Sequence, residues 1–172
     1  MRSEIRPGTA ADAPAVAALH SASWLSAYAG LLPPEALGDG LVQERRELWE
    51  IRLTVDYGEP ADTPVLLLAE SGRGLDGFGY LIPQPDGRVL LDNLHVRPGL
   101  TGGGIGSALL AACREHCRGR VLYLDVLAAN TRAVAFYERA GAVRTGSGAG
   151  WFPGGVRLPE YGYGFPVTPP VR

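Results

Sequence analysis

The stretch LLDNLHVRPGLTGGGIGSALLAACREHC, residues Leu90–Cys117, decides the fold of this chain. It begins with strand-forming residues that end at Pro98 and passes through glycines at positions 99, 102, 103, 104 and 106. It then continues with apolar side chains at helical spacing. A strand, a glycine loop and a helix in this order present free backbone N–H groups to an anion. We therefore expect a pyrophosphate-binding loop at the glycine cluster.

The residues that precede this stretch predict two helices and an antiparallel meander. Apolar residues recur at helical spacing, and short apolar runs are separated by turn residues such as Pro85-Asp86-Gly87. Strands joined by such short turns pair antiparallel. The helices are expected at about Ala10–Tyr28 and Leu41–Val55, and the strands at Glu4–Arg6, Val65–Ala69, Phe78–Ile82 and Arg88–Val96.

After the glycine loop, the chain predicts a helix, a strand at Val121–Val126 and a second helix from Asn130 to Gly141. A helix between two strands allows a right-handed crossover and a parallel pair. A glycine-rich turn between Ala142–Thr145 and Trp151-Phe152 precedes a last strand at Val156–Phe165. These elements predict one α+β domain, residues 1–166, with a mixed, mostly antiparallel central sheet of about six to seven strands flanked by helices. Residues 167–172 form a tail.

Composition and charge restrict the partners of this domain. The formal net charge of the 172 residues is −2, and the chain contains no lysine, so nothing favours a nucleic acid or an anionic membrane as partner. No apolar run reaches the roughly 20 residues of a membrane span, and the N-terminus has no secretory apolar region. We expect a soluble, cytoplasmic protein.

Cys113 and Cys117 lie four residues apart in the helix that follows the loop. They share one helix face and are expected as reduced, packed thiols rather than as a disulfide. His116 lies between them, but three ligands on one turn without a fourth make a poor metal site. We therefore expect no metal.

Two common nucleotide-binding motifs do not fit the glycine cluster. A Walker loop requires a lysine after its last glycine. The dinucleotide fingerprint requires three spaced glycines, whereas Gly102-Gly103-Gly104 is followed by Ser107 at the third position.

Two blocks together resemble another family. Leu94-His95-Val96-Arg97-Pro98, followed by TGGGIG at 101–106, is similar to the acetyl-CoA motif of the Gcn5-related N-acetyltransferases (GNAT). Asn130 followed by AVAFYERAG at 133–141 is similar to that family's second block. The resemblance implies the acyl-CoA N-acyltransferase fold and direct transfer of an acetyl group from acetyl-CoA to a primary amine. It departs from the family at Thr101, where Gln or Arg is usual.

The resemblance also implies roles for individual residues. Tyr137 would protonate the departing thiolate, Asn130 would hold the cofactor or a bridging water, and backbone N–H groups near Leu94–Val96 would polarise the thioester. An alternative for Tyr137 is packing beside Phe136 in the core. The expected cofactor-binding residues are Leu94, His95, Val96, Thr101, Gly102, Gly103, Gly104, Ile105, Gly106, Asn130 and Tyr137.

The acceptor amine must lose a proton, so the site requires a base. Many family members use a carboxylate on the strand before the loop, and here Asp92 is the first candidate and His95 the second. Strand alternation places Asn93 and His95 on one face and Leu94 and Val96 on the other, unless a bulge shifts the register. The alternative is that these polar residues pair locally.

Trp24 and Tyr28 lie four residues apart on the first helix, and they are expected with Asn93 to border the acceptor, unless they belong to the core. Tyr161 and Tyr163 are further candidates. The acceptor is a small molecule or a peptide, and the resemblance allows a homodimer. Two other functions remain open: a non-catalytic acyl-CoA-binding or regulatory module, and a transferase of longer acyl or aminoacyl groups.

Overall fold

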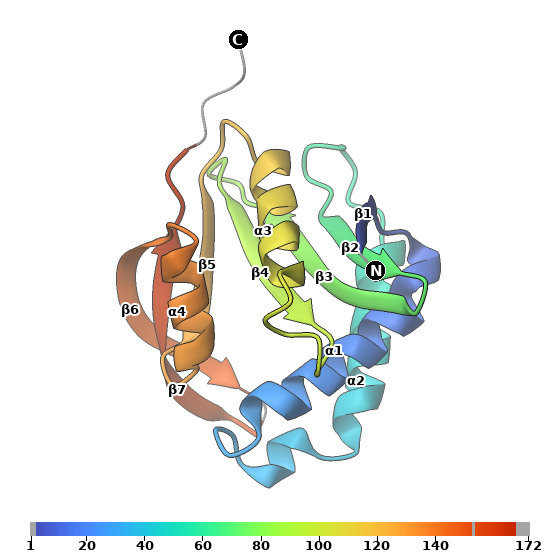
Figure 1. The fold of residues 1–172 in the computed structure, drawn as a ribbon, viewed down its shortest axis with the longest axis vertical. Helices are drawn as coiled ribbons and strands as arrows, with labels where there is room; N and C mark the ends of the chain where they lie inside the picture. Colours follow the sequence, from blue (N-terminus) through green and yellow to red (C-terminus); the bar gives the residue numbers. More distant parts are fainter. Residues whose placement is uncertain (1–2, 153, 168–172) are drawn as a thin grey trace.

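The computed structural model describes residues 3–152 and 154–167. A seven-stranded sheet runs in the order β1-β2-β3-β4-β5-β7-β6 and is flanked by four α-helices (Figure 1). Most of the predicted tail at 167–172 lies outside the described residues. The strands are β1 (Glu4–Pro7), β2 (Val65–Ser71), β3 (Gly74–Pro83), β4 (Val89–Val96), β5 (Leu122–Leu127), β6 (Val143–Phe152) and β7 (Val156–Gly164), and the helices are α1 (Ala13–Tyr28), α2 (Gly40–Thr54), α3 (Ile105–His116) and α4 (Thr131–Arg139).

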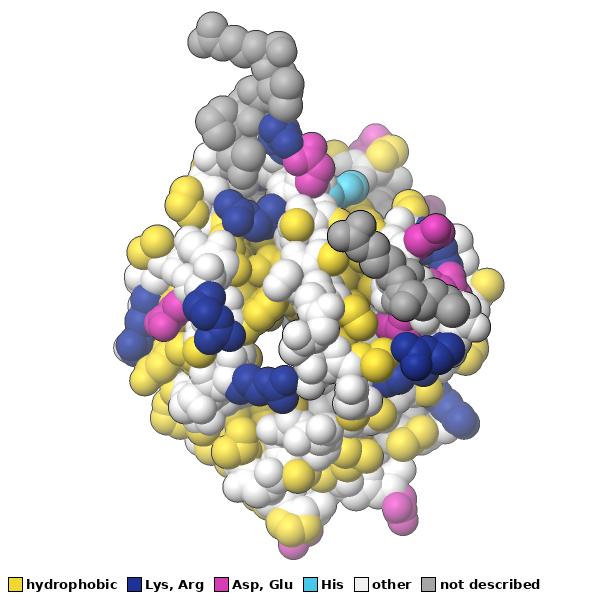
Figure 2. All heavy atoms as spheres, viewed as in Figure 1, with side chains coloured by type: hydrophobic (Ala, Val, Ile, Leu, Met, Phe, Trp, Pro, Cys, Tyr) yellow, Lys and Arg dark blue, Asp and Glu magenta, His cyan; other side chains and the backbone are white. Residues whose placement is uncertain are grey.

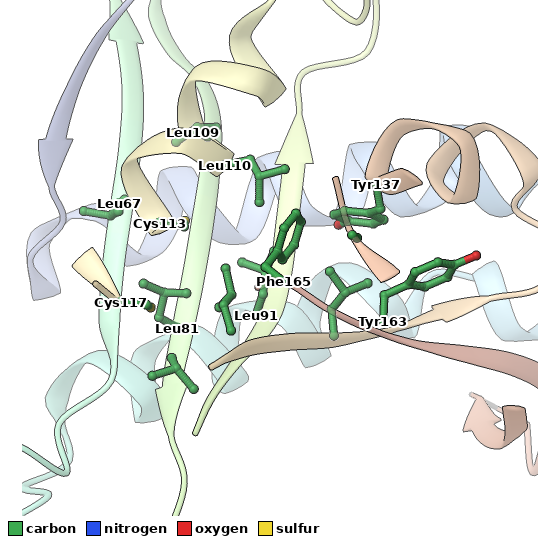
Figure 3. Close-up of a cluster of buried hydrophobic side chains, with 14 of the residues drawn as sticks. Leu67, Leu81, Leu91, Leu109, Leu110, Cys113, Cys117, Tyr137, Tyr163 and Phe165 are labelled. Carbon is green, nitrogen blue, oxygen red and sulfur yellow. The ribbon is translucent and has the colours of Figure 1, made fainter. Parts of the chain in front are cut away.

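The helices cover the sheet from both sides. In Figure 1, α3 and α4 lie in front of the sheet, and α1 and α2 lie behind it. Behind the sheet, Val16 of α1 and Trp49 of α2 pack on Phe78 and Tyr80 of β3. In front, the apolar side chains of α3 and α4 pack on the other face (Figure 3), and they include Leu109, Leu110, Cys113 and Tyr137.

The two cysteines belong to this front core. Cys113 and Cys117 are buried free thiols. Burial raises the pKa of the Cys113 thiol to about 12 and that of Cys117 to about 11. Both thiols therefore stay protonated at neutral pH, and thiolate reactivity is suppressed.

The sheet opens between its two parallel strands. β4 and β5 pair only at Val89–Leu122 and Leu90–Tyr123, and their later residues separate. The other neighbouring strands pair antiparallel. The open edge of β4 therefore lies inside the sheet, where its backbone groups are available to a strand-like ligand.

β4 also carries a bulge. Tyr80 of β3 pairs with Asn93, whereas Leu81 pairs with Leu91, so Asp92 is an extra residue in β4. After the bulge, successive side chains of β4 again point to opposite faces of the sheet. Asn93 and His95 pair with Tyr80 and Phe78 and lie on the rear face. Leu94 packs in the front core.

Local sequence explains several element boundaries. The Thr9 N–H donates to Asp12 Oδ2 at 2.8 Å, and a short 3₁₀ turn, Ala10–Asp12, precedes α1, so the α-helix begins at Ala13 and not at Ala10. Asn130 Oδ1 accepts from the Ala133 N–H at 3.2 Å and caps α4, as the sequence predicts.

One predicted turn is wrong. The segment 146–150 lies within the single strand β6, which pairs with β7 along its whole length. A Cβ atom at Gly150 would lie 2.4 Å or less from the carboxyl atoms of Glu160, so this glycine leaves room for the Glu160 side chain of β7. The glycines do not interrupt β6. Within the described residues, no helix has the length and hydropathy to cross a membrane.

Candidate functional site

A cavity of about 950 Å³ passes through the opening between β4 and β5. On the rear face it is lined by α1 and α2, including Ser23, Trp24 and Arg45. On the front face it is lined by the glycine loop and by α4, including Tyr137. Because it connects both faces, the cavity can place two ligands end to end, one from each side of the sheet.

The glycine loop forms the front entrance. Gly102 and Gly104 both have φ of +86°, and a Cβ atom at either position would meet no protein atom within 4 Å. The Ala108 N–H donates to Gly104 O at 3.0 Å as the first helical hydrogen bond of α3. The N–H groups before Ala108 have no intrahelical acceptor. They are available to an anion at the positive end of the helix dipole.

The same entrance carries positive charge. Arg132 and Arg139 of α4 line the cavity, and Figure 2 shows arginine side chains beside a hollow on this face of the molecule. Thr101 also lines the cavity at the loop. Glycine N–H donors with arginines nearby fit a pyrophosphate, and the open edge of β4 fits an extended, amide-bearing arm such as pantetheine.

Tyr137 of α4 belongs both to the front core and to the wall of the cavity. Its side chain lines the cavity and is 9 % exposed. Burial, with smaller effects from Tyr28 and Cys113, raises the pKa of Tyr137. The hydroxyl therefore stays protonated and can donate a proton or a hydrogen bond. Asn130 lines the cavity as well, although its Oδ1 is engaged in capping α4.

A chain of polar side chains lies behind the sheet. The Trp49 Nε1–H donates to His20 Nδ1 at 2.9 Å, which assigns the proton of neutral His20 to Nε2. The rings of His20 and His95 have centroids 4.7 Å apart, and His95 Nδ1 lies 2.8 Å from Ser23 Oγ.

Both histidines are neutral at physiological pH. Burial lowers the pKa of His20 to about 2, with further effects from His95, Arg45 and Arg52. Burial and the charge of Arg45 lower the pKa of His95 to about 4. A neutral His95 in the cavity wall can accept a proton.

Asp92 lines the cavity but has local partners. Its Oδ2 lies 2.9 Å from Arg52 Nη2 and accepts from Asn93 Nδ2 at 2.6 Å. The hydrogen bond between Asn93 and Asp92 is the local pairing that the sequence left open as an alternative. Both of these contacts hold the Asp92 carboxylate at the cavity wall.

Aromatic rings form the rear wall. The ring centroids of Trp24 and Tyr28 lie 4.7 Å apart, and Phe152 of β6 lies 6.4 Å from each. Glu160 of β7 also lines the cavity, and burial, with the nearby Asp125, raises its pKa.

The structure brings most of the predicted site residues together. Gly103 and Ile105 do not line the cavity: the Gly103 N–H is directed to Leu100 O at 3.4 Å, and Ile105 packs into the front core. Tyr161 and Tyr163 are not among the lining residues either. The predicted residues that line it are Trp24, Tyr28, Asp92, Asn93, Leu94, His95, Val96, Thr101, Gly102, Gly104, Gly106, Asn130 and Tyr137.

Sequence reasoning missed several lining residues on the rear face. They come from segments that carry no recognisable motif. Ser23 and His20 lie on the same helical face as Trp24 and Tyr28. Their spacing along the helix could therefore have indicated that they border the cavity. Arg45 and Arg52 belong to a helix whose alternating charges indicate a solvated face. Phe152 and Glu160 lie on the C-terminal strands, where the sequence named only Tyr161 and Tyr163 as candidates.

A glycine loop at a helix start, two separated parallel strands and a cavity joining both sheet faces define the acyl-CoA N-acyltransferase fold. The acetyltransferase (GNAT) family matches residues 24–142 of this chain, and the chain belongs to that family. It is an N-acetyltransferase by family, and acetyl-CoA is the cofactor of such enzymes.

Individual relatives agree with this assignment. A probable N-acetyltransferase of Mycobacterium tuberculosis, Rv2775, is 29% identical over 167 residues, which cover 92% of this chain and 91% of the relative. The PaiA N-acetyltransferase of Thermoplasma acidophilum, in complex with coenzyme A, has a TM-score of 0.73 at 20% identity and covers 96% of this chain and 99% of its own. YncA of Salmonella typhimurium, a putative acetyltransferase with acetyl-CoA, has a TM-score of 0.69 at 16% identity and covers 100% and 98%.

Proposed function

We propose that this enzyme transfers the acetyl group of acetyl-CoA directly to a primary amine held on the rear side of the sheet. The observation that supports the proposal is the cavity that joins the glycine loop to the aromatic wall through the opening between β4 and β5. Acetyl-CoA supplies an activated thioester to this cavity. An acceptor entering from the rear side would meet it there without a covalent enzyme intermediate.

The chain binds and orients the donor through backbone groups. The loop N–H groups from Thr101 to Gly106, apart from that of Gly103, which is directed to Leu100 O, hold the pyrophosphate. The open edge of β4 holds the pantetheine arm, and a β4 N–H near Leu94–Val96 stabilises the negative charge that develops on the carbonyl oxygen. Thr101 replaces the usual Gln or Arg of the family, which removes a side-chain donor but leaves the backbone donors in place.

Tyr137 is proposed as the proton donor. Its hydroxyl lies in the cavity wall, and its raised pKa keeps it protonated over the working range of pH. It therefore delivers a proton to the departing thiolate, or stabilises the thiolate by a hydrogen bond.

We propose His95 as the proton acceptor, ahead of Asp92. When His95 donates its Nδ1 proton to Ser23 Oγ, 2.8 Å away, the Nε2 lone pair is free to accept the proton of the amine. Asp92, by contrast, is engaged by Arg52 and Asn93. We expect His95→Gln to lower kcat about 100-fold and Asp92→Asn to lower it less. The reverse order would assign the base to Asp92.

Calorimetric titration with acetyl-CoA, followed by thiol detection across an amine panel, tests the function. A saturable isotherm and thiol release that requires both donor and amine support the proposal. Absence of binding at millimolar acetyl-CoA would contradict it. Binding without thiol release for any amine would instead support a non-catalytic acyl-CoA-binding module, and preference for another acyl donor would indicate a longer-acyl or aminoacyl transferase.

A further inference from the structure

Two arginines of α2 extend into the rear half of the cavity, and the mechanism proposed above gives neither of them a role. Arg45 and Arg52 both line the cavity. Arg45 is only 6 % exposed, although the alternating charges of its helix are typical of a solvent-exposed face. A buried guanidinium is costly unless its N–H groups find acceptors.

The donors of Arg45 are incompletely satisfied. Its Nη1 lies 3.1 Å from Oε1 of Glu44, whose side chain is 60 % exposed, so the acceptor of this pair is largely hydrated. The buried Nε of Arg45 has no hydrogen-bond partner in the described part of the chain. The guanidinium carbon lies 4.5 Å from the centroid of the Trp24 ring, and this stacking fixes the orientation of the guanidinium group.

Arg52 has a similar free donor. Its Nη2 lies 2.9 Å from Asp92 Oδ2, while its Nη1 is buried and unpartnered among the described residues. Its guanidinium lies over the rings of Trp49 and Tyr80, 5.2 and 5.0 Å from their centroids. Two guanidinium groups held against aromatic rings thus line one cavity, and each has a buried N–H without an acceptor among the described residues.

The cavity must also place the amino group of the acceptor near the proposed base. Arg45 lies over the Trp24 ring, the ring centroids of Trp24 and His20 are 6.2 Å apart, and those of His20 and His95 are 4.7 Å apart, so the guanidinium and the proposed base lie in the same part of the cavity. Asp92, Asp125 and Glu160 are the acidic residues of the cavity lining. The cavity is therefore mixed in charge, with fixed cations on α2 and carboxylates on the strands.

We propose that the acceptor is an amine that also carries a carboxylate, which Arg45 and Arg52 bind while the amino group faces His95. This inference rests on the proposed function and specifies its substrate class. A planar guanidinium matches a carboxylate in shape and in donor spacing, and a carboxylate in the rear half of the cavity would offset the two positive charges that line it. The aromatic wall of Trp24, Tyr28 and Phe152 favours an apolar side chain on the acceptor, as in an apolar amino acid.

The test compares substrates that differ only in the charge of one group. Thiol release is measured with L-phenylalanine and L-leucine, with their amides, and with the diamine cadaverine. We expect kcat/KM for the acids to exceed that for the amides by about 10- to 100-fold, as for the loss of a charged hydrogen bond. The amino group of an amide is less basic and more often uncharged, so intrinsic reactivity does not favour the acid.

A matched pair of variants locates the effect. Arg45→Gln should bring the ratio of kcat/KM for the acids to kcat/KM for the amides toward one, whereas Arg46→Gln, at an exposed neighbouring position of α2, should retain the wild-type ratio. Calorimetric binding of acetyl-CoA and the circular dichroism spectrum show that each variant is folded. If Arg45→Gln does not fold, the wild-type comparison of acids with amides still decides the question.

The outcomes separate this inference from the function on which it depends. Equal or better turnover of the amides, or preference for cadaverine, would overturn the carboxylate site while leaving the N-acetyltransferase activity established. A lack of acetyl-CoA binding would overturn both. Loss of the acid preference in Arg46→Gln as well as in Arg45→Gln would also overturn it, because the effect would then reflect net charge and not a contact.

Discussion

The buried imidazole of His20 makes the stability of this protein depend on pH. His20 is 3 % exposed, accepts a hydrogen bond from the Trp49 indole, and has its pKa lowered from 6.5 to about 2. The unfolded chain binds a proton at this residue below about pH 6.5, whereas the folded protein does not. The stability contributed by neutral His20 is therefore complete above pH 6.5 and is lost as the pH falls toward 2.

The size of this effect follows from proton linkage. Between pH 7 and pH 5, preferential protonation of one unfolded histidine of pKa 6.5 removes about 2 kcal/mol of unfolding free energy. In His20→Asn, the side-chain oxygen can still accept from the Trp49 indole, but the titrating group is absent. We therefore expect the wild-type protein to lose about 2 kcal/mol more than His20→Asn over this interval.

Urea denaturation at pH 7, 6 and 5 measures this difference. Each protein is compared with itself across pH, so an overall loss of stability in His20→Asn does not disturb the result. His116, which is exposed at the end of α3, provides the control, and His116→Gln should follow the wild-type pH dependence. An unchanged pH dependence in His20→Asn would refute the assignment of a buried neutral imidazole.

Substitutions at three further positions, each paired with a control substitution, test the proposed roles of individual residues. Tyr137→Phe should lower kcat about 100-fold or more with little change in acetyl-CoA affinity, whereas Tyr123→Phe, which lies outside the cavity, should leave both unchanged in steady-state and calorimetric assays. Gly104→Ala and Gly119→Ala, at φ of +86° and +82°, should each lose about 1–2 kcal/mol in denaturation. Only Gly104→Ala should also weaken acetyl-CoA binding, and equal binding by the two would argue against the loop as the anion site. Asn130→Ala should lose about 1 kcal/mol of stability and Asn130→Asp much less, since aspartate also caps helices.

The front half of the site was predictable from sequence, because backbone conformation determines it. Glycines are needed at Gly102 and Gly104 for a positive φ, and Asn130 is a common residue for capping a helix. Such residues leave a local signature that sequence spacing reveals. Equally local patterns predict six of the seven strands and the packed thiols of Cys113 and Cys117.

The rear half was less predictable, because tertiary packing creates it. Arg45 reads as a surface residue until α2 packs against α1 and places it over Trp24. The sequence ranked His95 second to Asp92 as a candidate base. The bulge at Asp92, which separates the side chains of Asp92 and His95, arises from pairing with β3 and is not visible in the sequence of β4 alone. The glycines of β6 predicted a turn in its middle. The side chain that fills the space over Gly150 is the carboxylate of Glu160, which comes from another strand, so the local sequence does not reveal it.

The narrow junction between β4 and β5 also has a consequence for the mechanics of the molecule. Two residue pairs connect a four-stranded half, β1 to β4, with a three-stranded half that contains β5, β7 and β6. A ligand that pairs with the open edge of β4 and contacts α4 would fasten the two halves together. Saturation with acetyl-CoA at 100 times its Kd would add about 2.7 kcal/mol to stability. We expect amide exchange to slow most along β4 and β5, so the donor substrate would act as a missing strand of the fold.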